Sequence, residues 1–327
     1  MERIFCIYCK KTIEISVNDS QICPNCAEIL KVPQAELFNG VFILKNEASA
    51  LRELEKLLKE KIYFKGLHEI TTNSFEVNDK HSITILKLNN NNILVLPVLL
   101  NEFKNLAELK ITSRSLTTVD ENFQPPNLNE LSFFSCPFIV IPKALIQCTS
   151  LKSLWISGSK ITSIPKAIGK LINLECLKLN NNKIKSINTS VRNLQKLSIL
   201  DVGCNFIDEL PSVLVELENL TILKVHVNNL DKLPEDINKL HKLQVLEIYC
   251  NFLTRLPQLP LDLKYLDVSS NFNLELTENL EEFKDLRLLN VGGNTKINLS
   301  ELKKVLNESS LVSKLSPLAP TSNLLEK

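Results

Sequence analysis

Apolar positions recur along most of the chain at a fixed spacing. From Leu174, Leu197 and Leu220 the same arrangement begins again, with aliphatic residues at the first, fourth and sixth positions and an asparagine at the ninth. Aligning this pattern in both directions gives ten copies, and seven of the nine intervals are 23 residues long. The copies begin at Ile83, Leu106, Leu128, Leu151, Leu174, Leu197, Leu220, Leu243, Leu263 and Leu286. Each copy predicts a short strand with inward leucines, and successive strands pair in parallel about 4.8 Å apart.

The ninth position is polar in a pattern that is otherwise apolar. A buried amide donates and accepts, so we expect this side chain to satisfy backbone groups of its own turn and of the neighbouring coil. Asparagine stands there in seven copies: Asn91, Asn182, Asn205, Asn228, Asn251, Asn271 and Asn294. Cys136 and Ser159 are weaker substitutes, and Arg114 departs from the pattern. We expect the asparagine ladder to break locally at Arg114.

Proline follows the fourteenth position in six copies, and its fixed φ suits the first residue of a short helix on the convex side. These prolines are Pro97, Pro142, Pro165, Pro211, Pro234 and Pro257. The inner side of the helices is predicted to be buried through Ile168, Leu171, Leu214, Leu217, Ile237 and Leu240. One copy, which starts at Leu243, has only 20 residues and the sequence LPQLP, which predicts an extended convex segment without a helix.

The register LxxLxLxxN/CxL resembles the leucine-rich repeat family over about two-thirds of the chain. The resemblance implies an α/β solenoid: a curved horseshoe with a parallel concave sheet and protein ligands on that face. The LPQLP copy is similar to the compact repeats of secreted bacterial effectors, some of which carry a ubiquitin-ligase domain after the solenoid. About thirty residues follow the last repeat here, and we expect no such domain.

The exposed ends of such a stack need covers. The predicted organisation is a four-cysteine module over 1–32, a linker and helical N-terminal cap over 33–82, repeats over 83–297, and a cap helix with a flexible tail over 298–327. An apolar stripe at helical spacing predicts the first cap helix over Asn46–Ile62. Its alternative is a partner-binding or coiled-coil helix, for which its length is short. Ser300 is the predicted N-cap of the second helix.

Four cysteines near the start, Cys6, Cys9, Cys23 and Cys26, form the spacing C-x2-C-x13-C-x2-C. Two such pairs can place four thiolates tetrahedrally around one Zn²⁺, and the module resembles a zinc ribbon with two strands turning around residues 17–19. Four protein ligands leave no open position, so this zinc is expected to be structural. An iron site and a redox dithiol are the alternatives. The first pair is followed by Lys10 where zinc knuckles usually have glycine.

Charge and composition narrow the functional classes. Lys and Arg number 38 against 37 Asp and Glu, and the four-cysteine module is neutral, which argues against nucleic-acid binding through bulk electrostatics. No apolar run approaches the roughly 20 residues of a membrane-spanning helix, and the first residues lack the apolar core of a signal peptide. Nine cysteines without an export signal favour a reducing compartment. The predicted location is cytoplasmic, or the host cytosol for a secreted bacterial effector.

Aromatic residues mark the candidate partner surface. Phe134 and Trp155 map to the concave face, where exposed aromatics are typical interface anchors. A second cluster joins concave and rim positions: His226, Tyr249, Tyr265, Phe206, Phe252 and Phe272. In both clusters the alternative is that the rings pack against their surroundings and fill space.

These features together predict a non-enzymatic scaffold that binds a protein partner on its concave face or rim. No glycine-rich phosphate loop occurs, and no cysteine has the partners of a nucleophile, so we predict no catalytic residues. The alternatives are a bacterial effector or ubiquitin-ligase-related adaptor, and a nucleic-acid binder that uses the zinc ribbon.

Overall fold

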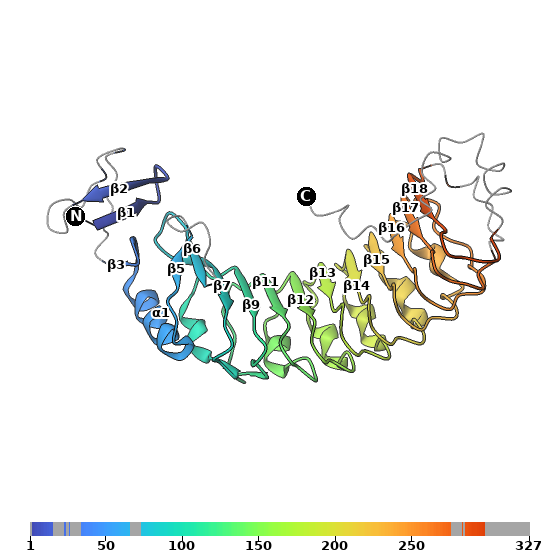
Figure 1. Ribbon diagram of the computed structural model, residues 1–327, viewed down its shortest axis with the longest axis horizontal. Coiled ribbons are helices and arrows are strands. Elements are labelled where there is room, and N and C mark those ends of the chain that lie inside the picture. The colour runs from blue at the N-terminus through green and yellow to red at the C-terminus, as the bar shows by residue number, and fades with distance from the viewer. Residues whose placement is uncertain are drawn as a thin grey trace. The chain divides into compact units, whose positions relative to one another are not determined.

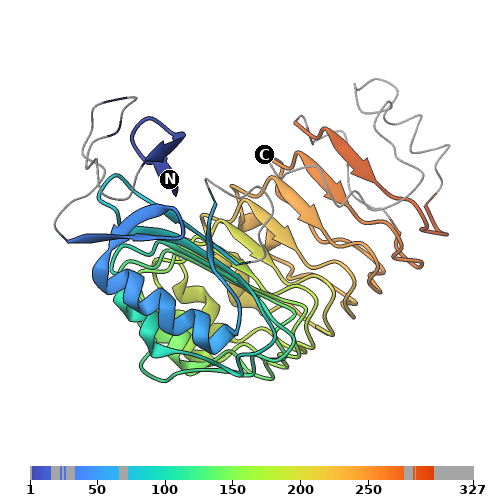
Figure 2. The same cartoon turned by 60° about the vertical axis from the view of Figure 1, so that its left-hand side comes forward.

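The chain forms two compact units in the computed structural model. The structure describes residues 2–15, 23, 26, 34–65, 73–275, 283 and 285–297. Unit 1 comprises Met1–Phe138 and Pro142–Leu154, and unit 2 comprises Ile139–Ile141 and Trp155–Lys327. Figures 1 and 2 show repeated coils that each contribute one strand to a sheet. Each unit contains a stack of leucine-rich coils, as the spacing of the leucines predicts.

Unit 1 begins with two hairpins and a helix. Strands β1 (Glu2–Cys6) and β2 (Lys11–Ile15) are antiparallel, as are β3 (Ala35–Phe38) and β4 (Val41–Leu44). Helix α1 (Lys45–Leu58) follows β4 directly. The remaining strands are β5 (Tyr63–Phe64), β6 (Ser74–Val77), β7 (Ile83–Asn89), β8 (Val95–Leu96), β9 (Glu108–Thr112), β10 (Thr118–Val119) and β11 (Glu130–Phe134). From β7 the sheet strands pair in parallel, whereas β6 pairs with β7 antiparallel.

Helix α1 covers the first coil of unit 1. It contacts the 3-10 helix η1 (Val98–Glu102) of that coil, and Glu47 accepts hydrogen bonds from the Ser82 hydroxyl and the Ile83 amide. The helix ends four residues earlier than predicted, because Lys59 takes a left-handed backbone with φ 56°. Ile62 is buried outside the helix, and Leu57, an apolar residue within the predicted helix, is exposed.

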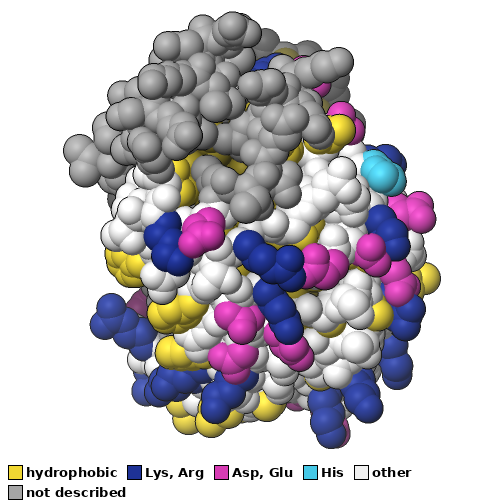
Figure 3. All heavy atoms as spheres, turned by 90° about the vertical axis from the view of Figure 1, so that its right-hand side faces the viewer, with side chains coloured by type: hydrophobic (Ala, Val, Ile, Leu, Met, Phe, Trp, Pro, Cys, Tyr) yellow, Lys and Arg dark blue, Asp and Glu magenta, His cyan; other side chains and the backbone are white. Residues whose placement is uncertain are grey.

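Unit 2 contains the regular repeats. Its strands pair in parallel and in register in the order β13 (Cys176–Lys178), β14 (Ile199–Asp201), β15 (Ile222–Lys224), β16 (Val245–Glu247), β17 (Tyr265–Asp267) and β18 (Leu288–Asn290). Strand β12 (Ser153–Ser157) lies where the chain passes between the units. On the end face in Figure 3, hydrophobic side chains stand among basic and acidic ones.

The convex segments are single turns of 3-10 helix. They are η1 and η2 (Lys143–Gln147) in unit 1 and, in unit 2, η3 (Lys166–Lys170), η4 (Thr189–Asn193), η5 (Ser212–Glu216) and η6 (Ile237–Lys239). Pro97, Pro142, Pro165 and Pro211 stand at the N-cap, one residue before the predicted position. The six predicted inner residues are fully buried, and residues 253–262 of the short copy contain no helix, both as predicted.

The asparagine ladder connects consecutive coils of unit 2. The Asn205 amide donates to the Leu179 and Val202 carbonyls at 3.0 and 2.9 Å and accepts from the Ile184 amide at 2.9 Å. One side chain therefore bonds to its own coil and to the preceding coil, as the sequence predicts. Comparable bonds are made by Asn182, Asn228, Asn251, Asn271 and Asn294.

The prediction for Asn91 is wrong. In the first coil Asn90 is buried and Asn91 is exposed, and in the second coil Ser113 is buried while Arg114 is exposed. The inward side chain therefore stands at the eighth position in these two coils. From the third coil onward the eighth residue has a left-handed backbone, which turns the ninth side chain inward. These left-handed residues are Ser135, Gly158, Asn181, Cys204, Val227, Cys250, Ser270 and Gly293.

Some predicted features cannot be compared with the structure. The cap helix from Ser300 and the tail over 298–327 lie outside the described residues. Within the described part of the chain, none of the helices has the length and apolarity that a membrane crossing requires.

Candidate metal centre and partner surface

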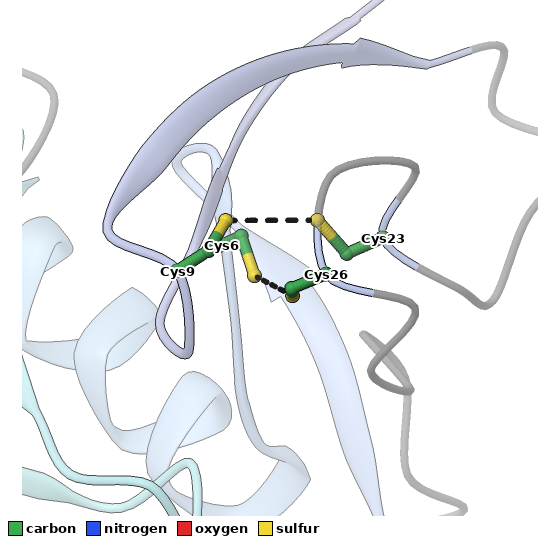
Figure 4. A group of neighbouring side chains, drawn as sticks. All are labelled: Cys6, Cys9, Cys23 and Cys26. Atoms are coloured by element: carbon green, nitrogen blue, oxygen red, sulfur yellow. Dashed lines mark hydrogen bonds between the residues drawn. The ribbon is translucent and has the colours of Figure 1, made fainter.

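The four N-terminal cysteines converge as their spacing predicts. Their sulfur atoms all lie within 4.8 Å of one another, with 3.7 Å between Cys6 and Cys26 and 3.8 Å between Cys9 and Cys23 (Figure 4). A tetrahedron of sulfurs around Zn²⁺ at a Zn–S distance of about 2.3 Å has edges of about 3.8 Å. A disulfide needs about 2.05 Å, so these pairs form no disulfide and their sulfur atoms stand at metal-ligand spacing.

The first cysteine pair lies on a tight turn between β1 and β2. The Lys10 amide donates to the Cys6 carbonyl at 3.0 Å, and Lys10 has a φ of 58°, the left-handed region that glycine favours. The chain thus adopts the turn without the usual glycine. Strand β2 supplies the first predicted strand between the cysteine pairs, whereas the predicted turn at residues 17–19 lies outside the described residues.

The sulfur cluster is closed and apolar. Cys6 and Cys23 are buried with Ile4 and Ile13, and Leu37 and Phe42 pack against the same cluster. Burial raises the pKa of the Cys6 thiol to about 12. A cation is therefore needed to hold thiolates there at neutral pH, and four sulfurs complete a tetrahedral shell. The donor set fits a structural metal ion and leaves no coordination position for a substrate.

The four-cysteine module is joined to the N-terminal cap within unit 1. The Phe5 amide donates to the Gly40 carbonyl at 2.8 Å, and the Phe5 ring lies 5.0 Å from the Phe64 ring. On the other side of the turn the Tyr8 hydroxyl donates to the Asp79 carbonyl at 3.3 Å. The module therefore packs on β4, β5 and the loop before β7.

Trp155 lies half-buried on its strand, and both its ring face and its indole N–H already have partners within the chain. The Lys178 ammonium stands 4.4 Å from the centre of its ring, and its indole N–H donates to Asn180 Oδ1 at 3.2 Å. Such a cation–π contact stabilises the exposed part of the ring by about 0.5–1 kcal/mol. Phe134 is half-buried at the end of β11 in unit 1.

His226 and Tyr249 are brought together on the concave face of unit 2. Their rings stack with centroids 4.5 Å apart, and His226 Nδ1 lies 3.5 Å from Glu247 Oε2. Burial lowers the pKa of His226 and raises the pKa of Glu247. Both shifts favour neutral side chains. The two rings therefore pack against each other on the concave face. This agrees in part with the alternative, left open by the sequence, that these rings fill space.

Tyr265 forms a hydrogen bond within its own strand. Its hydroxyl donates to Asp267 Oδ2 at 3.4 Å, and Asp267 is fully buried with further hydrogen bonds from Ser269 and Asn290. The sequence prediction missed Glu247 and Asp267 as partners of the aromatic residues. It also missed Gly203, which lies beside the His226 ring. The chain has only seven glycines, and this scarcity was the only sign in the sequence of a structural role for a glycine here.

The three rim phenylalanines are open to solvent. Phe206, Phe252 and Phe272 have exposed fractions of 50%, 63% and 59%. Large apolar side chains exposed in a row are typical of interaction surfaces. Their exposure excludes the alternative that they add to the core.

Three described cysteines outside the sulfur cluster have a shifted pKa. None of the three is activated as a nucleophile. Burial raises the pKa of Cys136 to about 12 and of Cys148 to about 11, and it also raises the pKa of Cys204. Nucleophilic cysteines need the opposite shift.

Comparisons with known proteins agree with the fold. The family model of a leucine-rich repeat region matches residues 162–319. No curated protein matches the sequence.

Solved structures with this fold come from several sources. The Leptospira interrogans LRR protein LIC12759 has a TM-score of 0.54 and 23% identity, over 70% of this chain and 71% of that chain. An internalin, InlF of Listeria monocytogenes str. 4b F2365, has a TM-score of 0.57 and 19% identity, over 82% and 76%. The structure PEPR1-AtPEP1 has a TM-score of 0.52 and 26% identity, and the match covers 64% of this chain but only 31% of that chain. The repeats, the coils and the family match together identify this as a chain with a leucine-rich repeat region.

Proposed function

We propose that the chain is a non-enzymatic scaffold that binds a protein partner through the rim and concave face of unit 2. The observation that carries the proposal is the row of exposed phenylalanines, Phe206, Phe252 and Phe272. Burial of solvent-exposed rings of this size by a partner contributes favourably to the free energy of binding. The structure PEPR1-AtPEP1 names a second component beside PEPR1, which supports this use of the fold.

Within the same proposal, the N-terminal cysteines hold one structural Zn²⁺. The sulfur spacing and the absence of a fifth donor among the described residues support it. None of the nine cysteines forms a disulfide in the described structure, which supports a reducing, cytoplasmic location. No reaction is assigned to the chain.

Affinity capture on the full chain tests the scaffold role. The test variant carries Phe206→Ser, Phe252→Ser and Phe272→Ser, and the matched control carries Ile139→Ser and Val140→Ser, two equally exposed apolar residues elsewhere in unit 2. We expect a specific protein to be captured by the wild type and the control but lost by the test variant, with unchanged thermal midpoints. Equal capture by all three proteins would refute the rim as a binding surface.

A further inference from the structure

The residues that follow the ladder positions form one continuous row along the rim of unit 2. The Lys183 amide donates to the Ile161 carbonyl at 2.8 Å, and the Phe206 amide donates to the Ile184 carbonyl at 2.9 Å. Because each bond joins equivalent places of adjacent coils, the row has a fixed order. We give the name rim row to its six consecutive members from the fourth to the ninth coil: Lys160, Lys183, Phe206, Asn229, Phe252 and Phe272.

The rim row is divided by chemistry. Lys160 and Lys183 are exposed and make no ion pair in the described structure, and the same holds for Lys185, two residues after Lys183. The next four coils have Phe206, Asn229, Phe252 and Phe272 at this position, so phenylalanine replaces lysine in three of them. A cationic part is thus followed, coil by coil, by an aromatic part.

The surrounding charge has the same division. Residues 155–200 contain eight basic residues and one acidic residue, a net charge of +7. Residues 201–275 contain six basic and twelve acidic residues, a net charge of −6. The nearly neutral total of the whole chain conceals this opposition within unit 2.

Acidic residues also stand beside the aromatic part. In the row two residues further along each coil, Lys185 is followed by Asp208 and then Asp231, all exposed. The Asp208 amide donates to the Lys185 carbonyl at 3.4 Å, so these coils are adjacent. Asp208 and Asp231 therefore lie next to the phenylalanines and not next to Lys160.

The separation of basic and acidic residues along the rim row favours some classes of partner over others. A nucleic acid or an anionic bilayer laid along the rim row would meet favourable lysines at one end and Asp208 and Asp231 at the other. An entirely apolar partner would cover three lysines without neutralising them, and desolvating unpaired charges costs free energy. A segment with carboxylates at one end and apolar side chains at the other satisfies both parts.

We propose that the rim row binds a short peptide segment of a protein partner, with acidic residues against Lys160, Lys183 and Lys185 and apolar residues against Phe206, Phe252 and Phe272. The inference rests on the proposed scaffold function and adds the chemistry and direction of the ligand. Five coil intervals of about 4.8 Å give a row of about 24 Å, which about seven or eight extended residues span.

Selection of a random twelve-residue peptide library on the full chain tests this inference. We expect the enriched peptides to share an acidic block followed or preceded by an apolar block, in one preferred order. Binding of a synthetic consensus peptide is then measured on variants. Lys160→Glu with Lys183→Glu and Lys185→Glu should weaken binding roughly tenfold or more, and the effect should shrink at high salt.

The matched control is Lys166→Glu with Lys170→Glu, which reverses two exposed, unpaired lysines on the convex helix η3 and should leave affinity within about twofold. Phe206→Ser and Phe252→Ser should each cost roughly tenfold. A thermal midpoint within a few degrees of the wild type confirms that each variant is folded.

Three results would overturn the inference. Enriched peptides without acidic residues that still need the phenylalanines would remove it and leave the scaffold function intact. Tighter binding of a single-stranded oligonucleotide, or of phosphatidylcholine vesicles containing phosphatidylserine, at the same lysines would assign the row to a polyanion. No enriched peptide, together with unchanged capture by the phenylalanine variant, would remove the scaffold function as well.

Discussion

The imidazole of His226 is held between the Tyr249 ring and the backbone of Gly203. The two rings are nearly parallel, with an interplanar angle of 8°, and a Cβ added to Gly203 would lie 2.4 Å from the His226 ring. The three residues occupy equivalent positions in consecutive coils. The glycine therefore makes room for the histidine, and the tyrosine prevents the ring from moving away.

Gly203→Ala should consequently destabilise the protein by about 1–3 kcal/mol, the usual cost of overpacking a filled site. Chemical unfolding of the full chain measures the change. The same substitution in a His226→Ala background should cost much less, because the ring that meets the new methyl group is absent. An equal loss of stability in the two backgrounds would show that a clash with His226 is not the reason why Gly203→Ala is destabilising.

The free energy of unfolding should fall as the pH drops below about 6.5, because of His226. Burial lowers the folded-state pKa of His226 below its ordinary value of 6.5, so the unfolded chain binds more protons in the window beneath that pH. Glu247 contributes with the opposite sign. Its raised pKa means that the folded chain binds more protons above pH 4.5, so this contribution grows as the pH falls.

The two effects are separated by His226→Gln. The stability advantage of the wild type over this variant should shrink between pH 7.5 and 5.5, measured by urea unfolding at several pH values. His241→Gln changes an exposed histidine and serves as the control. A parallel pH dependence in the wild type and in His226→Gln would assign the acid sensitivity to other groups.

Val227→Asn should stabilise the protein by about 1 kcal/mol. Val227 has a φ of 52°, a left-handed conformation that a β-branched side chain adopts at a cost of about 1–3 kcal/mol. Its side chain is exposed, so the substitution loses little buried area. Asn181→Val at the equivalent position, φ 56°, should have the opposite effect. A shift of the thermal midpoint in the same direction for both variants would contradict the proposal that the left-handed backbone is strained at Val227.

The repeat spacing predicted the fold because every coil buries its own leucines against its neighbours. The starts of all ten copies are buried, and the convex side of the short copy lacks a helix as its prolines indicate. The ladder prediction failed at Asn91 because Asn90 and Asn91 are chemically identical in the sequence. Only the backbone turn decides which of the two amides points inward.

The candidate sites were predictable to different degrees. Cysteine spacing alone predicted that the four sulfurs come together, and a tight turn after Cys6 positions the first pair. The pairing of His226 with Tyr249 and Gly203 depends on which coils lie next to one another, and the alternation of residue types does not reveal it. The charge division of unit 2 is present in the sequence but cancels in the total of the whole chain.

Removal of the metal should loosen unit 1 selectively. Metal analysis of the purified full chain should give one equivalent of zinc, without the visible colour of an iron–thiolate site, and Cys23→Ser should lose it. Leu37 and Phe42 pack on the sulfur cluster, so hydrogen exchange should accelerate in β3 and β4 of the metal-free protein. Strands β14 to β16 belong to unit 2 and should keep their protection. Protons compete for the thiolates, so zinc should also be lost on acidification.

The matched control for the metal prediction is Cys250→Ser, which removes an exposed cysteine of unit 2. This variant should retain one equivalent of zinc and normal exchange in β3 and β4. Retention of a full equivalent by Cys23→Ser would contradict a four-cysteine site, because three sulfurs bind Zn²⁺ more weakly and leave a position for water. Loss of zinc without faster exchange in β3 and β4 would show that the cluster does not stabilise the N-terminal cap through Leu37 and Phe42.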